Sequence, residues 1–123
     1  MNRLSICLLA GLLCFGSAAI ASDPAQKTVA AVYQERAQLK DQQVQVRGKI
    51  VKVNNQIMGR NFLHLQDGTG EKGSNDLTVT SQDFAKVGDE VIITGTVAVD
   101  VDFGSGYLYP LLIEKATVAQ VKQ

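Results

Sequence analysis

The sequence contains no tryptophan, one histidine, two prolines and two cysteines among its 123 residues. Both cysteines, Cys7 and Cys14, lie in an apolar N-terminal stretch that ends near Ala21. A chain from Ser22 onward therefore has no thiol, which excludes a disulfide framework, a zinc–cysteine site and a redox CxxC motif in that part. A metal site built on several histidines is excluded as well, because His64 is the single histidine.

Neither sign of charge is in excess, since 12 Lys and Arg balance 12 Asp and Glu. This balance excludes the strongly basic composition of many nucleic-acid-binding domains. The charges are nevertheless unevenly placed. Residues 27–60 carry seven basic and two acidic side chains, whereas residues 67–114 carry nine acidic and two basic ones. This asymmetry fits either a basic face for an anionic partner or an unevenly charged solvated surface.

Residues 1–21 have the pattern of a secretory signal peptide. Arg3 provides a positive start, Leu4 to Phe15 form an almost continuous apolar run, and Ala19-Ile20-Ala21 is a small-x-small cleavage site. The apolar run is shorter than the roughly 20 residues that a membrane-spanning helix needs. We therefore expect cleavage after Ala21, no stable membrane insertion afterwards, and a periplasmic protein.

The rest of the chain predicts one N-terminal helical segment, residues 22–41, and one barrel, residues 42–123. Asp23-Pro24 is typical of a helix start, and apolar residues then recur at helical spacing, which predicts a helix from about Ala25 to Lys40. From Val44 the apolar period changes to two, and its phase shifts near Gly48, which indicates a bulge or bend. Five strands are expected, in residues 44–53, 62–66, 77–81, 90–101 and 107–118.

Turn-rich segments connect these strands at residues 54–61, 67–75 and 102–106, and residues 86–89 are expected to form a tight turn into the fourth strand. Pro110 cannot donate a hydrogen bond to a ladder, so its part of the last strand should lie at an edge or bulge. Five short strands with a long, bent first strand predict an all-β fold with one N-terminal helix, built as a small closed barrel.

Two segments carry a family resemblance. Val44 to Val51 and Phe62 to Gly70 together resemble the OB-fold modules of the tRNA anticodon-binding type, which have V-x-V-x-G-x-V followed by F-[IL]-x-[IL]-x-D-x-[TS]-G. The whole pattern also looks like a group of small exported bacterial OB-fold proteins. The resemblance implies a five-stranded Greek-key barrel that binds its ligand on the outer face of the second and third strands and on loops 54–61 and 102–106.

By this resemblance Phe62 matches the aromatic residue on which a base stacks, although the same residue could instead close the barrel end beneath a loop. His64 and Gln66 would share its face, while Leu63 and Leu65 would point into the barrel. Basic side chains on the first strand and its following loop would meet phosphates. The candidate ligand-binding residues are Phe62, His64, Gln66, Arg47, Lys49 and Arg60.

Apolar residues on the long loops allow a second interpretation. Ile57, Met58, Phe103 and Tyr107 either fold back over the barrel mouth or form a rim that contacts a partner protein. No nucleophile, base and orienting residue can be assembled from one histidine and scattered carboxylates, so we expect no catalytic residue, no metal site and no cofactor. Asp67-Gly68-Thr69-Gly70 is interpreted as a turn with an aspartate cap rather than a phosphate-binding loop.

The sequence thus predicts a non-catalytic, exported OB-fold binding protein. Its expected ligand is single-stranded nucleic acid or another anionic or extended molecule. The alternative is a periplasmic interaction or assembly factor with an envelope protein partner, associated by family resemblance with electron transfer through cytochromes.

Overall fold

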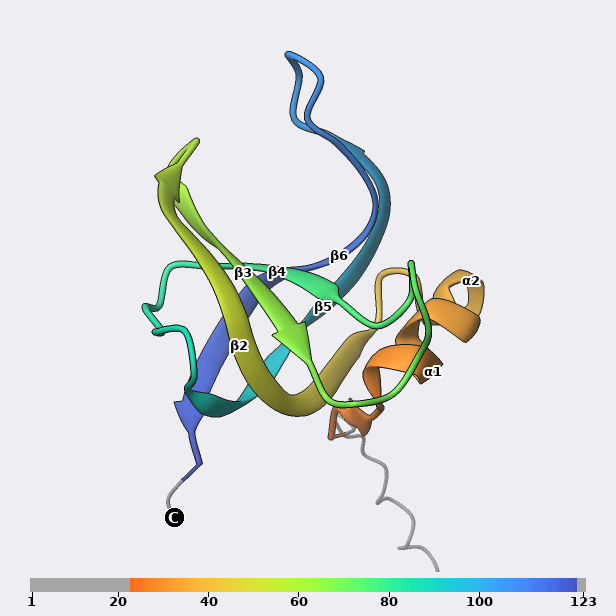
Figure 1. Ribbon diagram of the computed structural model, residues 1–123. Coiled ribbons are helices and arrows are strands. Elements are labelled where there is room, and N and C mark those ends of the chain that lie inside the picture. Colours follow the sequence, from red (N-terminus) through yellow and green to blue (C-terminus); the bar gives the residue numbers. More distant parts are fainter. Residues whose placement is uncertain (1–22, 122–123) are drawn as a thin grey trace, which may run out of the picture.

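The structure is a computed structural model that describes residues 23–121 (Figure 1). The predicted signal peptide, with Cys7 and Cys14, lies outside these residues. Six strands form one sheet: β1 (Ala25–Gln26), β2 (Gln43–Ile57), β3 (Arg60–Gln66), β4 (Leu77–Ser81), β5 (Glu90–Asp102) and β6 (Leu108–Gln120).

The sheet closes on itself. Its order is β1-β2-β3-β4-β6-β5, and β5 also pairs with β2. The five long strands therefore form the predicted OB-like barrel, with β1 as a short parallel addition beside Val44 and Gln45. Among the residues that the structure describes, none forms a helix long and apolar enough to cross a membrane.

The long strand β2 closes the barrel because it has two partners. Gln43 to Lys49 pair antiparallel with β5, and Lys49 to Ile57 pair with β3. The register shifts between Ile50 and Lys52, which confirms the bend predicted from the phase change near Gly48. Gly48 is needed there because a Cβ atom would lie 2.7 Å from the carbonyl oxygen of Gln66.

The helical segment differs from the prediction. Ala25 and Gln26 are strand residues, and helix α1 covers only Val29–Gln34, followed by α2 at Arg36–Leu39. Thr28, not Asp23, is the N-cap, and its hydroxyl accepts a hydrogen bond from the N–H of Ala31 at 3.1 Å. The predicted helix from Ala25 to Lys40 was therefore too long, because a tertiary pairing with β2 takes its first residues.

Helix α1 is part of the barrel core. Val29 and Val32 are fully buried in the same apolar cluster as the inward side chains of the strands. Leu63 and Leu65 of β3 also point into this cluster, as their alternation predicted. An N-terminal helix thus supplies the apolar cover that one end of a small barrel requires.

Two hairpins extend beyond the closed part of the barrel, and Figure 1 shows both at the end of the molecule opposite the C-terminus. The β2–β3 arm comprises residues 54–62 and turns at Met58-Gly59, where both residues have positive φ, 53° and 78°. Two such residues suit a tight hairpin, so most of the predicted loop 54–61 is strand instead.

The β5–β6 arm comprises residues 98–112 and turns at residues 103–107, close to the predicted loop 102–106. In this arm β6 pairs with β5, whereas β4 pairs with β6 only at Ile113 and Ala116. Pro110 therefore has a free edge on one side, as predicted.

Candidate ligand-binding face

The outer face of β3 carries the three residues that alternate with its core leucines. Phe62, His64 and Gln66 lie on this face, and the ladders define their neighbours. On the β4 side these are Thr80 and Thr78, opposite Phe62 and His64. On the β2 side, Asn54, Lys52 and Lys49 lie opposite Phe62, His64 and Gln66, respectively. We call these eight residues the outer face.

Three aromatic rings meet at the upper end of the outer face and form the aromatic cluster: Phe62 from β3, and Phe103 and Tyr109 from the β5–β6 arm. The ring of Phe62 lies 5.7 Å from that of Phe103 and 5.6 Å from that of Tyr109, between centroids. Phe103 and Tyr109 are 5.8 Å apart. Edge-to-face and tilted contacts at these distances are favourable because the rings' quadrupoles attract one another.

The aromatic cluster forms a small apolar core outside the barrel. Phe62 is only 3% exposed, yet it does not belong to the main core cluster, and neither do the buried residues Ala98 and Leu112. Thr78 and Thr80 are buried too, although they lie on the outer face. The β5–β6 arm thus covers this part of the face, and Phe62 is not an open platform for stacking.

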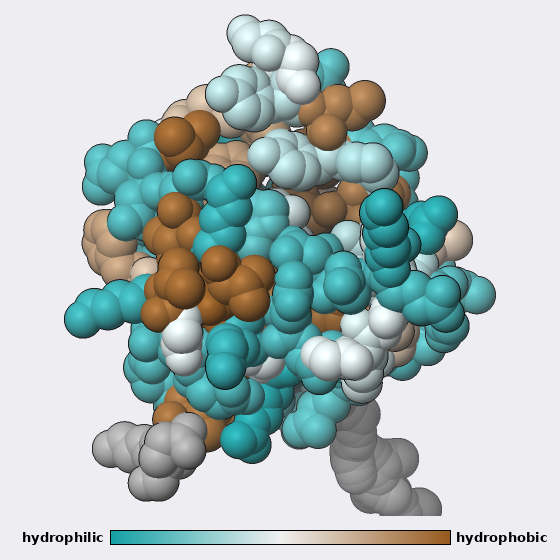
Figure 2. Space-filling model, in the orientation of Figure 1, coloured by the Kyte–Doolittle hydropathy of each residue, from teal (hydrophilic) through white to brown (hydrophobic). Residues whose placement is uncertain are grey.

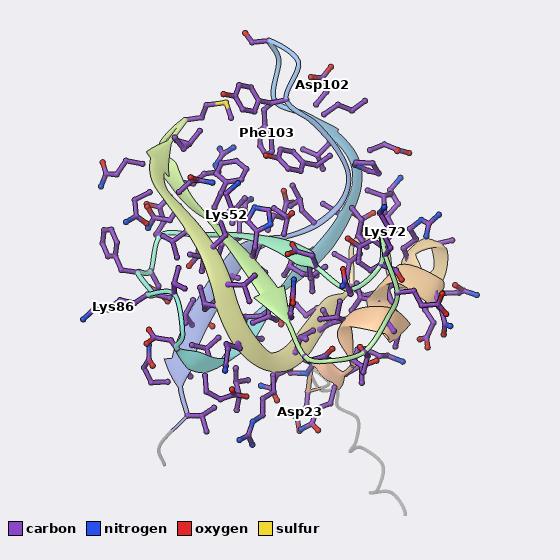
Figure 3. All side chains as sticks on the ribbon, viewed as in Figure 1. Asp23, Lys52, Lys72, Lys86, Asp102 and Phe103 are labelled. Atoms are coloured by element: carbon purple, nitrogen blue, oxygen red, sulfur yellow. The ribbon has the colours of Figure 1, made fainter. Side chains whose placement is uncertain are left out.

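Arg60 joins the two arms across the aromatic cluster. Its guanidinium carbon lies 4.8 Å from the centroid of the Phe103 ring, within the range of a cation–π contact. Figure 3 places Phe103 between the two arms. Arg60 begins β3 and Phe103 follows β5, 43 positions later in the sequence, so nothing in either local pattern indicated this contact.

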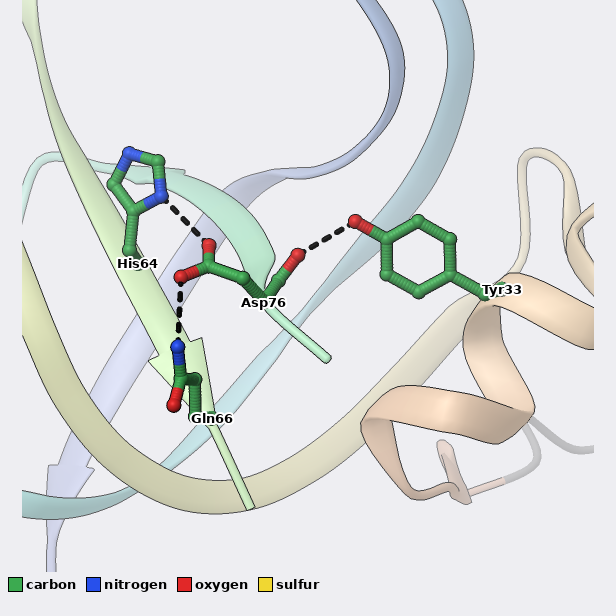
Figure 4. Close-up of polar contacts among 4 residues, drawn as sticks. All are labelled: Tyr33, His64, Gln66 and Asp76. Atoms are coloured by element: carbon green, nitrogen blue, oxygen red, sulfur yellow. Dashed lines mark hydrogen bonds and ion pairs between the residues drawn. The ribbon is translucent and has the colours of Figure 1, made fainter. Parts of the chain in front are cut away.

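His64 and Gln66 belong to a polar network centred on Asp76 (Figure 4). The Nδ1 atom of His64 lies 2.7 Å from one carboxylate oxygen of Asp76, and the amide of Gln66 donates to the other at 3.2 Å. The hydroxyl of Tyr33 donates to the carbonyl oxygen of Asp76 at 2.5 Å. Burial raises the pKa of Tyr33, and the nearby Asp76 carboxylate raises it further, while Arg36 opposes them.

The candidate basic residues do not converge on one point. Arg47 is largely exposed, and its Nε atom lies 3.6 Å from a carboxylate oxygen of Glu90. Lys49 pairs with Gln66 at the lower end of β3, whereas Arg60 begins β3 at its upper end. Those two ends are six positions apart along the strand, which is about 20 Å. Lys52, beside His64, lies between them and was not singled out from the sequence.

The apolar loop residues divide between the two predicted roles. Met58 and Tyr107 are exposed at the tips of the two arms, by 41% and 46%, and Ile57 is half-buried. Phe103 instead turns into the aromatic cluster. Leu108 and Phe84 are also exposed, which was not predicted from the sequence. Figure 2 shows hydrophobic residues near this end of the molecule and along β2 on an otherwise hydrophilic face.

The segment from Asp67 to Gly70 anchors helix α1. One carboxylate oxygen of Asp67 accepts a hydrogen bond from the N–H of Val29 at 2.9 Å, and the hydroxyl of Thr69 accepts one from the N–H of Ala30 at 3.0 Å. Burial alone would raise the pKa of Asp67, but hydrogen bonds from Thr69 and the Val29 N–H outweigh it and hold that pKa below its usual value. This segment is therefore structural.

Residues 23–121 contain no group of three or more His, Cys, Asp or Glu side chains that could hold a metal ion. Asp100 and Asp102 are exposed on the β5–β6 arm, and Asp102 accepts a hydrogen bond from the N–H of Gly104 in the hairpin turn.

Comparison with known proteins supports the fold alone. No protein-family model matches the chain, and no curated protein matches it. Among solved structures, it is similar to a protein named as an aspartyl-tRNA synthetase from Leishmania major Friedlin, with a TM-score of 0.53 and 14% identity. The match covers 87% of this chain and 23% of that chain, so it corresponds to one segment of a much longer protein. This likeness agrees with the OB-like barrel.

Proposed function

We propose that this chain is a non-catalytic, exported OB-fold binding protein whose ligand lies along the outer face, between the two arms. Single-stranded nucleic acid is the ligand we put forward, because its bases and phosphates match the two kinds of group found there. The observation that carries the proposal is the aromatic cluster at one end of a face that also carries Lys49 and Lys52. Strands β2 and β3 contain no acidic residue. The acidic residues beside this face are Glu90 of β5, which pairs with Lys49, and Asp76, which is bonded to His64.

Each component of the outer face has a role in this proposal. Aromatic rings provide stacking energy of about 1–3 kcal/mol per base, which does not depend strongly on sequence. Lys49, Lys52 and Arg60 would neutralise successive phosphates along β2 and β3. The structural likeness to a segment of an aspartyl-tRNA synthetase supports the proposal as an analogy of fold, since one fold carries many functions.

The test is a titration of residues 22–123 with labelled single-stranded RNA and DNA at about 50 and 200 mM salt. We expect binding that weakens with salt. The variant Lys52→Ala should bind more weakly and lower the salt slope by about 0.7, the value for one phosphate contact on a single strand. Lys86→Ala is the matched control, because Lys86 is equally exposed but lies on the loop between β4 and β5, away from Lys52 (Figure 3).

Two outcomes would reject the nucleic-acid ligand: no binding at about 50 mM salt, or equal effects of the two lysine substitutions. Phe62→Ala is a less suitable test, because Phe62 is buried and its removal would destabilise the fold as well.

A second candidate function is a periplasmic interaction or assembly factor, associated with envelope electron transfer. The exposed Met58, Tyr107 and Leu108 at the tips of the arms favour it, because exposed apolar residues gathered at one end commonly mark a contact with another protein. The double variant Ile57→Asp with Met58→Asp separates the two functions. It should keep oligonucleotide binding if the outer face holds the ligand, and abolish partner binding if the tips do.

A further inference from the structure

Phe103 is half-buried in the aromatic cluster, as Tyr109 is, whereas Phe62 is buried. Phe62 lies beneath it with 3% exposure, and Tyr109 lies beside it. On another side Phe103 meets the guanidinium of Arg60 at 4.8 Å. A planar ring in this position is thus held by two aromatic rings and one cation, which is an arrangement suited to any flat unsaturated ring.

The backbone around Phe103 allows its ring to move while the strands of the barrel stay in place. Phe103 follows the last residue of β5, and the next three residues, Gly104, Ser105 and Gly106, all have positive φ, from 53° to 87°. Beyond Val97 and Ile113, this arm is paired only within itself. Withdrawal of the Phe103 ring would therefore break no hydrogen bond of the closed barrel.

Two hollows lie near the aromatic cluster, and both have a basic residue in their lining. One, of about 340 Å³, is lined by Tyr109 of the cluster and by Thr78 and Arg36. The other, of about 370 Å³, is lined by Arg60, which contacts Phe103, and by Thr80, Lys115 and the acidic Asp83. An anionic substituent of a ring seated on Phe62 and Tyr109 would find its nearest cations in Arg36 and Arg60.

We propose that Phe103 fills a ring-binding site of this protein and is displaced when a ligand with a planar, anionic ring group, such as a nucleotide, binds. The ligand ring then takes the contacts that Phe103 makes with Phe62, Tyr109 and Arg60. This inference rests on the proposed function and adds to it: Phe103 competes with the ligand instead of contributing to its binding.

The experiment compares Phe103→Ala with the parent protein. Adenosine monophosphate and a short single-stranded oligonucleotide are the probes, and ribose 5-phosphate, which has no aromatic ring, is the control ligand. We expect Phe103→Ala to bind both probes about tenfold more tightly, since no aromatic contacts have to be broken first. Tyr107→Ala, which removes an exposed ring from the same hairpin turn, should leave affinity unchanged.

A second measurement guards against misfolding of the alanine variant. Phe103→Leu keeps an apolar side chain over Phe62 but has no ring, and it should also bind more tightly. In NMR spectra the ring signals of Phe62 and Tyr109 should shift when adenosine monophosphate is added, and they should not shift with ribose 5-phosphate.

The outcomes separate this inference from the proposed function. Weaker or equal binding by Phe103→Ala and Phe103→Leu, with clear binding by the parent, would overturn the displacement inference and leave the proposed function in place. Absence of binding to the oligonucleotide and the nucleotide in the parent and in both variants would overturn the two together.

Discussion

Asp67 connects two parts of the chain that are 38 residues apart, because its carboxylate accepts the N–H of Val29 at the start of α1. It also accepts hydrogen bonds from the backbone N–H and the hydroxyl of Thr69. A single side chain thereby fixes both the loop after β3 and the helix that covers the barrel. An asparagine in its place would have only one side-chain oxygen that can accept hydrogen bonds.

We predict that Asp67→Asn lowers the free energy of unfolding at pH 7 by about 1 kcal/mol, as loss of a helix cap does. The pKa of Asp67 is lower in the folded protein than in the unfolded chain, where it is about 3.9. The stabilisation that ionised Asp67 provides is therefore complete above the pKa of the unfolded chain, and it is lost as the pH falls through the pKa of the folded protein. The difference between parent and variant should therefore shrink between about pH 5 and the acid limit of folding.

Thermal or urea unfolding followed by circular dichroism measures this difference. Glu71→Gln is the control, because Glu71 is an exposed carboxylate on the same loop, and it should change stability little at any pH. An Asp67→Asn variant as stable as the parent at pH 7 would contradict the anchoring role.

At the residue scale, the sequence predicted which side chains of β3 face outward but not how buried they are. The alternation of residues along β3 was enough to predict that Leu63 and Leu65 point into the barrel, because successive side chains of a strand point to opposite faces. The burial of Phe62 depends on Phe103 and Tyr109, which reach it from a hairpin about 40 residues away, and no local pattern contains that information. The Asp76 partner of His64 and Gln66 was missed for the same reason.

At the scale of elements, the pairing of β5 with β6 depends on Gly95. A Cβ atom at Gly95 would lie 2.6 Å from Cγ2 of Ile113 and 2.9 Å from the carbonyl oxygen of Glu114. The register between β5 and β6 shifts at this point, between Thr94 and Thr96. The two strands can approach so closely only because Gly95 has no side chain.

We predict that Gly95→Ala destabilises the protein by about 2–3 kcal/mol, because the added methyl group overpacks a contact with backbone that cannot move freely. Gly73→Ala is the comparison: a Cβ at Gly73 meets nothing within 4 Å, but φ is 92°. That substitution carries only the cost of a left-handed conformation, about 1 kcal/mol. Equal unfolding midpoints in urea for the two variants would contradict the packing argument.

The elements themselves were predicted to different degrees. The limits of β4 were predicted correctly, and those of the other long strands to within a few residues, because polar and apolar residues alternate along them. The start of α1 was wrong because Ala25 and Gln26 pair with β2, which is a tertiary interaction. Residues 54–61 were expected to be a turn-rich connection, but most of them belong to the hairpin strands β2 and β3. Pairing across a hairpin is not visible in local composition.

At the scale of the whole molecule, the two arms differ in charge. The β2–β3 arm carries Arg60 and has no acidic residue, whereas the β5–β6 arm carries Asp100 and Asp102 and has no basic residue. A polyanion between the arms would therefore lie nearer the first, as the proposed role of Lys52 requires. The uneven distribution of charge along the sequence thus corresponds to a difference in charge between the two arms.

Export is the prediction that concerns the whole chain. When the complete sequence is expressed in a bacterium, the protein released by osmotic shock should begin at Ser22, as measured by intact mass. Ala21→Asp should block processing, because signal peptidase needs a small residue at that position. Ser17→Ala should be processed normally. A released protein that still begins at Met1 would contradict cleavage after Ala21.

The described chain begins and ends at the side of the barrel away from the two arms, as Figure 1 shows for the C-terminus and Figure 3 for Asp23. This arrangement has a practical consequence. A protein immobilised through either terminus, on a sensor chip or by fusion to a carrier, presents its aromatic cluster and arm tips to the surrounding solution. Surface-based assays can therefore use a tag at either end, and agreement between the two orientations would show that attachment does not obstruct the outer face.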